Sequence, residues 1–496
     1  MSQLYHVLRR VISFGLDLYF VDIQSHGVEN VPKWGPVIFA ANHPNSIMDT
    51  MILGFCSERQ VHYMARSGLF EHLPLKFIFD RCGVIPVYRS QDGTDKSKNA
   101  SSFEAAFELL EGGKVLGIFP EGRNSQEWRV IDIKTGTARI ALGVEARNDF
   151  DLGVRVVPVG LNYQDRDRFL TSVLLRFGEP IDVRKWKEQY EGDDREAVRD
   201  LTRTIQQGIE AQTLHVENVV VWEMARALAR IAERSYISEL VEEREEFGEL
   251  VRKSESRRKS FTKGVINRMR FVDRAPQLSE RFDSEQLLSD ALMHELETKP
   301  LAFAELRASV RQYEDHLAQV RLRHDFAARH PATLSSRKEG AKLTFYALLV
   351  GPFAIWGFVH NVLPYQLVKV AAKRAPDEAI RAMTAFVFGT LFFLSWYGLI
   401  GWGLWVWNEE SLVEASVYVS SMPLTGFIFL RYRKRVAGWR DKILARTLFR
   451  TQQNLVNTLF DERERLSERV AMLLDDYLAE RPERLEELGV SGLEEE

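Results

Sequence analysis

One stretch of the chain restricts its fold more than any other: no charged residue occurs between Arg381 and Glu409. A helix of this length can cross a hydrocarbon core of about 30 Å. The second half of the stretch is rich in tryptophan, which is typical of a segment that reaches a membrane interface. These residues are Trp396, Trp402, Trp405 and Trp407. The sequence therefore predicts a membrane helix at 382–408, and the alternative is a buried helical core in a soluble protein.

Two more apolar runs accompany this one. Residues 415–430 form a shorter uncharged run, and a third run between residues 342 and 369 is interrupted by glycine and proline. Basic residues precede the long run and follow the last one, whereas glutamates separate the two. The positive-inside rule then predicts a helical hairpin with spans at about 382–408 and 412–430 and both ends in the cytoplasm. Because the earlier run has basic residues on both sides, we expect it to dip into the membrane or to lie along it.

With 496 residues the chain is longer than one ordinary domain, and its composition divides it into regions. Short apolar strands alternate with helices over 26–184, which predicts an α/β domain with a mixed sheet flanked by helices. Charged residues and long helical stretches dominate 185–340, and 341–435 is the membrane-associated region. Residues 436–496 are expected to form a helix with an acidic tail. The apolar spacing in 1–25 predicts an amphipathic helix that lies on a membrane or packs on the α/β domain.

Charge and cysteine content exclude some classes of function. The net charge of −4 argues against general nucleic-acid binding. The two cysteines, Cys56 and Cys82, have no metal-ligand spacing and suit a reducing compartment without a disulfide framework. The basic run at 254–263 is more typical of a solvated face than of a site, although anionic lipid can use such a run. We therefore expect no metal and no nucleic-acid partner.

The segment Asn42–Asp49 carries the most chemical information. It follows an apolar, strand-like run at 36–41 and places His43 six residues before Asp49. Six residues correspond to about 240° around an ideal helix, so the two side chains meet only if His43 stands on the loop and Asp49 in the helix. A neutral imidazole can take a proton from an alcohol, and a carboxylate on its other nitrogen fixes the tautomer. The segment thus predicts a general base with its orienting carboxylate.

Two other segments are expected to form strands. The sequence from Gly83 to Arg89 is apolar and ends in an arginine, whose planar guanidinium suits a phosphate group. Taken alone, it would be an ordinary strand that ends in a surface arginine. Residues 156–160 form a buried strand without a titratable group, so we expect them to wall a pocket rather than to react.

A fourth segment follows the strand expected at 115–119. Glu121 is a candidate acceptor for hydrogen bonds from substrate hydroxyls, and Gly122 lets backbone approach a ligand closely. Arg123 and Lys134 are candidate cations for a phosphate group. For Lys134 the alternative of a plain surface lysine is about equally good.

Together these segments resemble the phospholipid and glycerol acyltransferase family. Its members share a His-x4-Asp block, a G-x-I-P-x-x-R-like block, an F-P-E-G-T-R-S-like block and a late V-P-V block, and the resemblance covers roughly residues 26–180. It implies that His43 is the general base and Asp49 its orienting residue. It also implies that Arg89 and the Glu121-Gly122 turn form a clamp for glycerol phosphate.

The sequence departs from the family pattern at two places. The first block reads His-x5-Asp, one residue longer than the common form, and is similar to the subgroup that contains fungal glycerol-3-phosphate and dihydroxyacetone-phosphate acyltransferases. The third block has Arg123 where threonine is usual and Asn124 where arginine is usual. The phosphate-binding role is therefore transferred to Arg123 as a hypothesis, and Lys134 is a candidate to share it.

The resemblance implies an enzyme of phospholipid biosynthesis, and the predicted hairpin implies that it is membrane-bound with its catalytic domain on the cytoplasmic face. It would move a fatty acyl group from acyl-CoA or acyl-carrier protein to a hydroxyl of glycerol 3-phosphate or dihydroxyacetone phosphate, with no cofactor besides the thioester co-substrate. Its partners would be the acceptor, the thioester donor and membrane lipid. Two alternatives stay open: lysophosphatidate or another lysophospholipid as acceptor, and a membrane scaffold with a decayed acyltransferase fold. The sequence has no G-x-S-x-G elbow and no H-E-x-x-H helix, which argues against a hydrolase.

Overall fold

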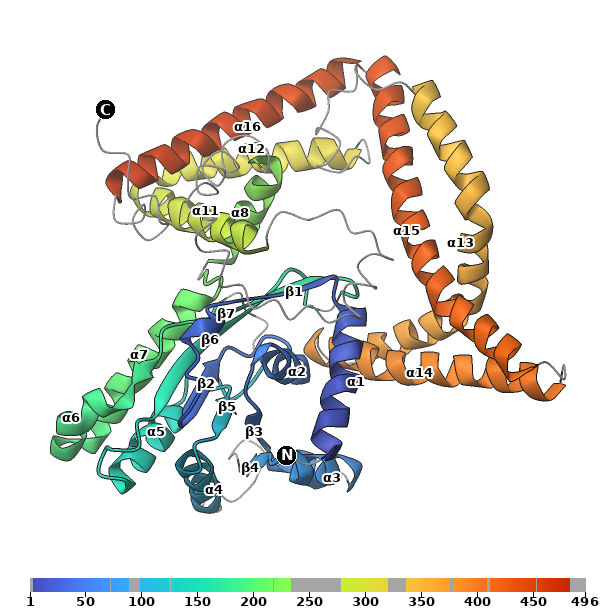
Figure 1. Cartoon of the computed structure of the whole chain (residues 1–496). Helices are drawn as coiled ribbons and strands as arrows, with labels where there is room; N and C mark the ends of the chain where they lie inside the picture. The colour runs from blue at the N-terminus through green and yellow to red at the C-terminus, as the bar shows by residue number, and fades with distance from the viewer. Residues whose placement is uncertain are drawn as a thin grey trace. The chain divides into compact units, whose positions relative to one another are not determined.

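Figure 1 shows the computed structural model of the chain, which forms two compact units. The structure describes residues 3–71, 73–88, 99–124, 127, 129–166, 168–216, 218–232, 278–319, 336–374, 378–407, 411–451 and 453–481. The first unit contains Met1–His215 together with Val368–Thr390, and most of the remaining described residues belong to the second. The basic run at 254–263 lies outside the described residues.

The first unit is built on a mixed sheet, as the sequence predicts. Its described strands have the order β1-β7-β6-β2-β5-β3-β4, and β8 pairs with β6. The pairs β6–β7 and β6–β8 are antiparallel, and the other pairs are parallel. The strands are β1 (Asp22–His26), β2 (Val37–Ala41), β3 (Val61–Arg66), β4 (Ile85–Val87), β5 (Val115–Ile118), β6 (Arg155–Tyr163), β7 (Ser172–Phe177) and β8 (Ile181–Asp182).

Helices cover both faces of this sheet (Figure 1). Successive strand residues point to opposite faces, so Ile38 and Ala40 join one core and Val37, Phe39 and Ala41 join the other. The first core includes α4, α5 and α7, and the second includes α1 and α2. The helices of this unit are α1 (Gln3–Tyr19), α2 (Ile47–Cys56), α3 (Leu73–Cys82), α4 (Asn99–Glu111), α5 (Gly136–Arg147), α6 (Lys187–Gly192) and α7 (Asp194–Gln212).

The α/β unit extends further along the chain than the boundary predicted at 184. In α7, Ala197, Leu201, Ile205 and Ile209 follow one another at four-residue intervals and are fully buried against the sheet. Side chains at this spacing share one face of a helix, which explains how a helix rich in charged residues belongs to the core. The first continuous segment of the unit therefore ends at about His215, and Val368–Thr390 joins the unit later in the chain.

The N-terminal helix α1 packs on the α/β domain through one face. Leu16 and Tyr19 are buried in the core beside α2, and Gly15 lies against the ring of Phe386 from α14. Val11 and Phe14 remain more than half exposed. Contact of this exposed face with a membrane stays a prediction.

A bundle of four helices forms part of the second unit: α8 (Val219–Ala232), α11 (Leu278–Thr298), α12 (Pro300–Gln319) and α16 (Gln453–Glu480). Tyr313 of α12 and Leu474 of α16 are fully buried. Helix α16 contacts α12 through a 2.9 Å hydrogen bond between His316 Nδ1 and a carboxylate oxygen of Glu462. Further ion pairs at the end of the bundle join it to α11 and to Lys299. Helix α16 therefore closes a bundle whose other members come much earlier in the chain.

Within the described parts of the chain, three helices are long and apolar enough to cross a membrane, by length and composition. They are α13 (Ser336–Lys373), α14 (Glu378–Trp407) and α15 (Leu412–Thr451). The candidate spans at 384–406 and 412–433 match the two predicted ones. The third differs from the prediction, because α13 continues through Pro352 and Pro364 without interruption. Helix α15 also continues beyond the predicted end at 430.

The three apolar helices interlock through small and polar residues. At Gly357 of α13, an added Cβ would lie 2.0 Å from the carbonyl oxygen of Thr425, so the backbones of α13 and α15 touch. Asn361 of α13 donates to the carbonyl of Met422 and accepts from the hydroxyl of Tyr397 in α14. Such close backbone contacts and hydrogen bonds between polar side chains are the usual means of helix association in lipid.

Candidate active site

The candidate site lies at one edge of the sheet. Strands β6, β2 and β5 are neighbours and parallel, so their carboxyl ends reach the same edge. His43 follows β2, Glu121 follows β5, and Tyr163 is the last residue of β6. Ligands of open α/β sheets bind outside the carboxyl ends of the strands, and this is where the predicted residues gather.

His43 and Asp49 form the predicted pair. His43 lies in the loop after β2, and Asp49 lies in the first turn of α2, which begins at Ile47. The distance from Nδ1 of His43 to Oδ2 of Asp49 is 2.9 Å. Since a carboxylate only accepts hydrogen bonds, Nδ1 carries the proton and Nε2 holds the lone pair. The His43 side chain is 18% exposed and that of Asp49 is fully buried, so the imidazole is the member that a substrate can reach.

Phe119 and Glu121, which follow β5 in the chain, contact His43 from its other sides. The ring of Phe119 stacks on the imidazole at a centroid distance of 4.1 Å. The backbone N–H of His43 donates to Oε1 of Glu121 over 3.1 Å. The imidazole is therefore fixed by a hydrogen bond, a ring stack and a backbone contact, which limits its rotation.

Asp49 receives more hydrogen bonds than the sequence suggests. Oδ2 accepts from the backbone N–H of Asn45 over 2.7 Å as well as from His43. Oδ1 accepts from the hydroxyl of Tyr163 over 2.6 Å. Sequence reasoning missed Tyr163, although the alternation of β6 contains a signal: Val157, Val159, Leu161 and Tyr163 all join the core beside α2.

Glu121 is a buried carboxyl group with one oxygen paired. The residue is 3% exposed, and its Oε2 is buried without a hydrogen-bond partner among the described residues. Burial raises the pKa of Glu121 to about 7, and the negative charge of Asp49 acts in the same direction. The hydrogen bond from His43 and the positive charges of Arg166 and Arg123 oppose this rise. Its predicted role as an acceptor for substrate hydroxyls stays a prediction.

The turn after Glu121 brings Lys134 to the site. Gly122 has a φ of 69°, a left-handed conformation that favours glycine. A Cβ added to Gly122 would lie 2.6 Å from Nζ of Lys134, and the backbone N–H of Lys134 donates to the carbonyl of Pro120. Lys134 is thus adjacent to the turn, and Arg123 is exposed beside it. Both candidate cations lie within the same loop cluster.

Arg166 is a second residue that the sequence did not reveal. It is 8% exposed and donates to the carbonyl of Glu127 over 2.7 Å, while its own carbonyl accepts from the side chain of Asn45. The residue therefore links the loop after β6 with the loops that carry His43 and Glu121.

Two parts of the predicted site remain, namely Arg89 and residues 156–160. Arg89 lies outside the described residues. Residues 156–160 were expected to wall a pocket, yet Val156, Val157 and Val159 are fully buried in the two cores of the sheet. The continuation of the same strand, at Tyr163, contacts the site instead.

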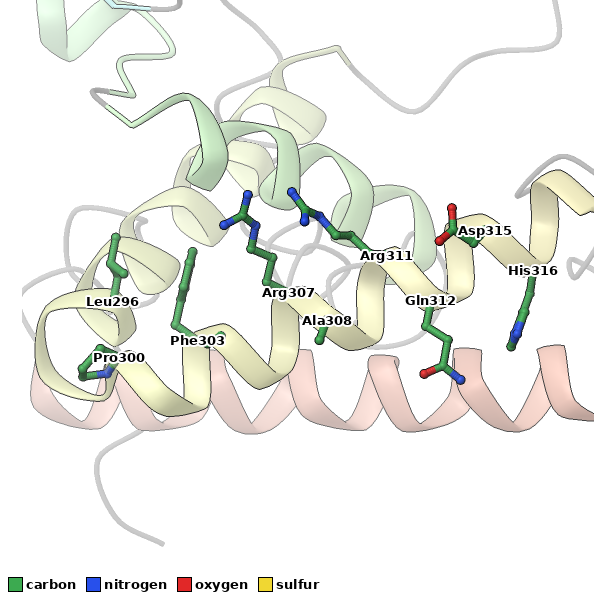
Figure 2. Close-up of a pocket in the computed structure, with 10 residues that line it drawn as sticks. Leu296, Pro300, Phe303, Arg307, Ala308, Arg311, Gln312, Asp315 and His316 are labelled. Carbon is green, nitrogen blue, oxygen red and sulfur yellow. The ribbon is translucent and has the colours of Figure 1, made fainter.

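The second unit contains a separate groove on α12, with a cavity volume of about 780 Å³ (Figure 2). Its lining includes Phe303, Arg307, Arg311 and His316. In Figure 2 both arginine side chains extend from the same side of α12. The groove belongs to the helical bundle and contains none of the residues at the sheet edge.

Comparison with known proteins finds a similarity over the α/β domain. Residues 22–162 match the family model named "Acyltransferase". This segment is therefore similar to the acyltransferase family, as the four sequence blocks predict.

Individual relatives are similar over the same part of the chain. Glycerol-3-phosphate O-acyltransferase 2 of Saccharomyces cerevisiae is 38% identical over 112 residues, which is 22% of this chain and 15% of the yeast protein. The 1-acyl-sn-glycerol-3-phosphate acyltransferase of Bacillus subtilis is 28% identical over 120 residues, or 24% of this chain and 56% of that protein. The chain thus matches less than two thirds of the length of either relative.

One solved structure is also similar: the 1-acyl-sn-glycerophosphate (LPA) acyltransferase, PlsC, from Thermotoga maritima. Its sequence is 24% identical, and the TM-score is 0.30. The similarity covers 41% of this chain and 80% of the Thermotoga chain.

Proposed function

We propose that this chain transfers a fatty acyl group from a thioester, acyl-CoA or acyl-carrier protein, to a hydroxyl of glycerol 3-phosphate or dihydroxyacetone phosphate. The observation that carries the proposal is the 2.9 Å contact between Nδ1 of His43 and Asp49 at the carboxyl edge of the sheet. The yeast relatives named glycerol-3-phosphate O-acyltransferase, 38% and 32% identical over about 110 residues, support this acceptor.

In the proposed mechanism His43 acts as general base. Its Nε2 takes the proton of the acceptor hydroxyl while the oxygen attacks the thioester carbonyl. A tetrahedral intermediate forms, its C–S bond breaks, and the imidazolium returns the proton to the leaving thiolate. Asp49 stabilises the imidazolium through Nδ1, and Arg123 and Lys134 bind the acceptor phosphate. The thioester is the only co-substrate that these steps require.

Variants of the pair test the mechanism. His43→Ala should lower kcat about 100- to 10,000-fold, the usual range for loss of a general base. His62→Ala is the matched control, because His62 is also an imidazole of this domain, in β3, and its Nδ1 contacts the carbonyl of Gly83. Hydrogen exchange of the β2 amides checks folding. Acyl transfer by a folded His43→Ala variant at the wild-type rate would refute the mechanism.

The proposed binding of the acceptor phosphate by Arg123 and Lys134 gives a separate prediction. Lys134→Ala should raise KM for the acceptor roughly tenfold with little change in KM for the thioester, because loss of one charge-assisted hydrogen bond to the phosphate weakens binding by about that factor. Lys134→Arg keeps the charge and should recover much of the affinity. An unchanged acceptor KM in Lys134→Ala would show that Lys134 does not bind the acceptor phosphate.

The alternative acceptor is a lysophospholipid, favoured by relatives named 1-acyl-sn-glycerol-3-phosphate acyltransferase. Purified full-length protein would be given radiolabelled acyl-CoA with glycerol 3-phosphate and lysophosphatidate in competition. We expect acylated glycerol 3-phosphate as the main product. Exclusive formation of phosphatidate would establish the alternative, and no thioester consumption with either acceptor would favour the scaffold.

We further propose that α14 and α15 form a membrane hairpin with the α/β domain on the cytoplasmic face. Helix α16 packs against α12 in one bundle, although α13, α14 and α15 lie between them in the sequence. Two helices in direct contact outside the bilayer are on the same side of it, so the chain between them crosses an even number of times. An even number agrees with two crossings rather than three, and the charge pattern of the sequence assigns them to α14 and α15.

Single cysteines would test this topology after Cys56 and Cys82 have been replaced by serine. Glu305→Cys on α12, Glu464→Cys on α16 and Ser411→Cys before α15 all place the thiol at an exposed position. In sealed vesicles, a membrane-impermeant maleimide should reach the first two positions from one side and Ser411→Cys from the other. Labelling of all three from one side would refute the hairpin.

A further inference from the structure

Tyr163 places its hydroxyl in the candidate active site, where the hydroxyl donates a hydrogen bond to Asp49. It lies 114 residues from Asp49 in the sequence, and its hydroxyl donates to Oδ1 of Asp49 over 2.6 Å in a buried environment. The tyrosine is 2% exposed and Asp49 is 0% exposed. Water is thereby excluded from the contact, and the carboxylate depends on protein donors for its stability.

The two oxygens of Asp49 have separate partners. Oδ2 faces the imidazole of His43 and the backbone N–H of Asn45, whereas Oδ1 faces Tyr163. A carboxylate held at both ends cannot rotate about its Cβ–Cγ bond without breaking a hydrogen bond. The orientation of Oδ2 toward Nδ1 of His43 is therefore fixed in part by a residue that does not touch the imidazole.

We propose that Tyr163 is a positioning residue that acts on His43 through Asp49, an inference that rests on the proposed acyltransferase mechanism. Its hydroxyl stabilises the carboxylate form of Asp49, shares its negative charge and holds Oδ2 in line with the imidazole. Burial and the charge of Asp49 raise the pKa of Tyr163 well above its usual value. The hydroxyl consequently keeps its proton, and donates it, throughout the pH range in which the enzyme would work.

Loss of the hydroxyl has two expected effects. The Asp49 side chain gains rotational freedom, so fewer molecules hold the imidazole in the reactive orientation. The unshared negative charge on Asp49 also becomes a stronger acceptor for Nδ1–H, which favours the imidazolium form of His43 over the neutral base. A loss of packing alone would lower stability but would produce neither effect.

The test compares wild type, Tyr163→Phe, Asp49→Asn and the double variant as full-length proteins in detergent. Acyl transfer is measured from palmitoyl-CoA to glycerol 3-phosphate and to lysophosphatidate, between pH 5.5 and 9. Tyr163→Phe should lower kcat about 10- to 100-fold, the range for loss of a hydrogen bond to a charged group, with KM nearly unchanged. The acidic limb of its kcat/KM profile should move to higher pH.

The double variant distinguishes positioning from a general packing defect. If Tyr163 acts through Asp49, its replacement should cost little further activity in the Asp49→Asn background. Tyr63→Phe is the matched control, because it removes a hydroxyl that donates to the carbonyl of Thr50 in the same helix α2. This control should leave the acidic limb in place.

The outcomes separate the two proposals. Wild-type kcat and an unshifted profile in Tyr163→Phe, with His43→Ala inactive, would overturn the role of Tyr163 and leave the mechanism intact. If Tyr163→Phe lowers kcat by the same factor in the wild-type and Asp49→Asn backgrounds, the role of Tyr163 is overturned as well. Full activity of His43→Ala would instead refute the proposed mechanism itself.

Discussion

Glu121→Gln should make the stability of the α/β domain less dependent on pH. Burial raises the pKa of this carboxyl group from 4.5 to about 7, and at about 1.4 kcal/mol for each pKa unit the ionised form is destabilised by about 3 kcal/mol. The folded state keeps the proton to higher pH than the unfolded chain does. The folded state therefore binds more protons between pH 4.5 and pH 7, and stability falls as pH rises through that window.

Glutamine resembles the protonated acid in shape and cannot ionise. Its amide oxygen can still accept the hydrogen bond from the backbone of His43. The free energy of unfolding of the variant, relative to wild type, should thus be nearly constant below about pH 4 and should rise by about 3 kcal/mol by pH 8. Glu188→Gln on the exposed surface of α6 provides the control.

Hydrogen exchange followed by mass spectrometry can measure this in the full-length protein. Peptides from β2 and β5 report opening of the α/β domain alone, and the ratio of variant to wild type at each pH removes the intrinsic pH dependence of exchange. We expect this ratio of protection to grow about 30-fold between pH 5.5 and pH 8.5, because about 2 of the 3 kcal/mol are lost within that interval. A ratio that stays flat, as in the control, would show that Glu121 ionises without difficulty and that the burial argument is wrong.

Three glycine positions give further predictions. Gly122→Ala places a Cβ at a φ of 69° and displaces the ammonium of Lys134, so acceptor KM should rise and stability should fall by about 1–2 kcal/mol in a denaturant titration; an unchanged KM would contradict this. Gly357→Leu meets the backbone carbonyl of Thr425, so the helices should separate and the variant should be lost from detergent-solubilised membranes, whereas retention at the wild-type level would be inconsistent with the packing. Gly15→Leu overlaps a phenylalanine ring of α14 and should destabilise by about 1–3 kcal/mol, measured as a lower Tm; a wild-type Tm would refute the contact.

The part of the site that could be predicted from the sequence is local. His43 and Asp49 lie within one strand-loop-helix segment, so the geometry of that segment alone determines whether they meet, and the contact has the predicted arrangement. Phe119 and Glu121 follow the neighbouring strand directly, and parallel pairing brings them to the same edge. For His43 and Asp49 the spacing along the chain is sufficient, whereas the place of Glu121 beside them depends on the pairing of β5 with β2.

The contacts that were missed depend on pairings that spacing does not specify. Tyr163 reaches Asp49 because β6 lies beside β2 in parallel register, and no short-range pattern states which strand is the neighbour. The buried face of α7 was hidden by the charged residues between its apolar positions. The prolines of α13 suggested an interruption, whereas a helix packed against other helices can accommodate the lost hydrogen bonds.

The position of α16 in the bundle has a consequence for biosynthesis. Its partners α8, α11 and α12 leave the ribosome before the three apolar helices, and α16 leaves after them. The buried faces that receive Leu466, Val470 and Leu474 therefore lack their cover until the apolar segment has been synthesised and the chain has returned. Completion of the bundle is thus a late event, and a nascent chain truncated before α16 would leave these apolar faces open to chaperones and proteases.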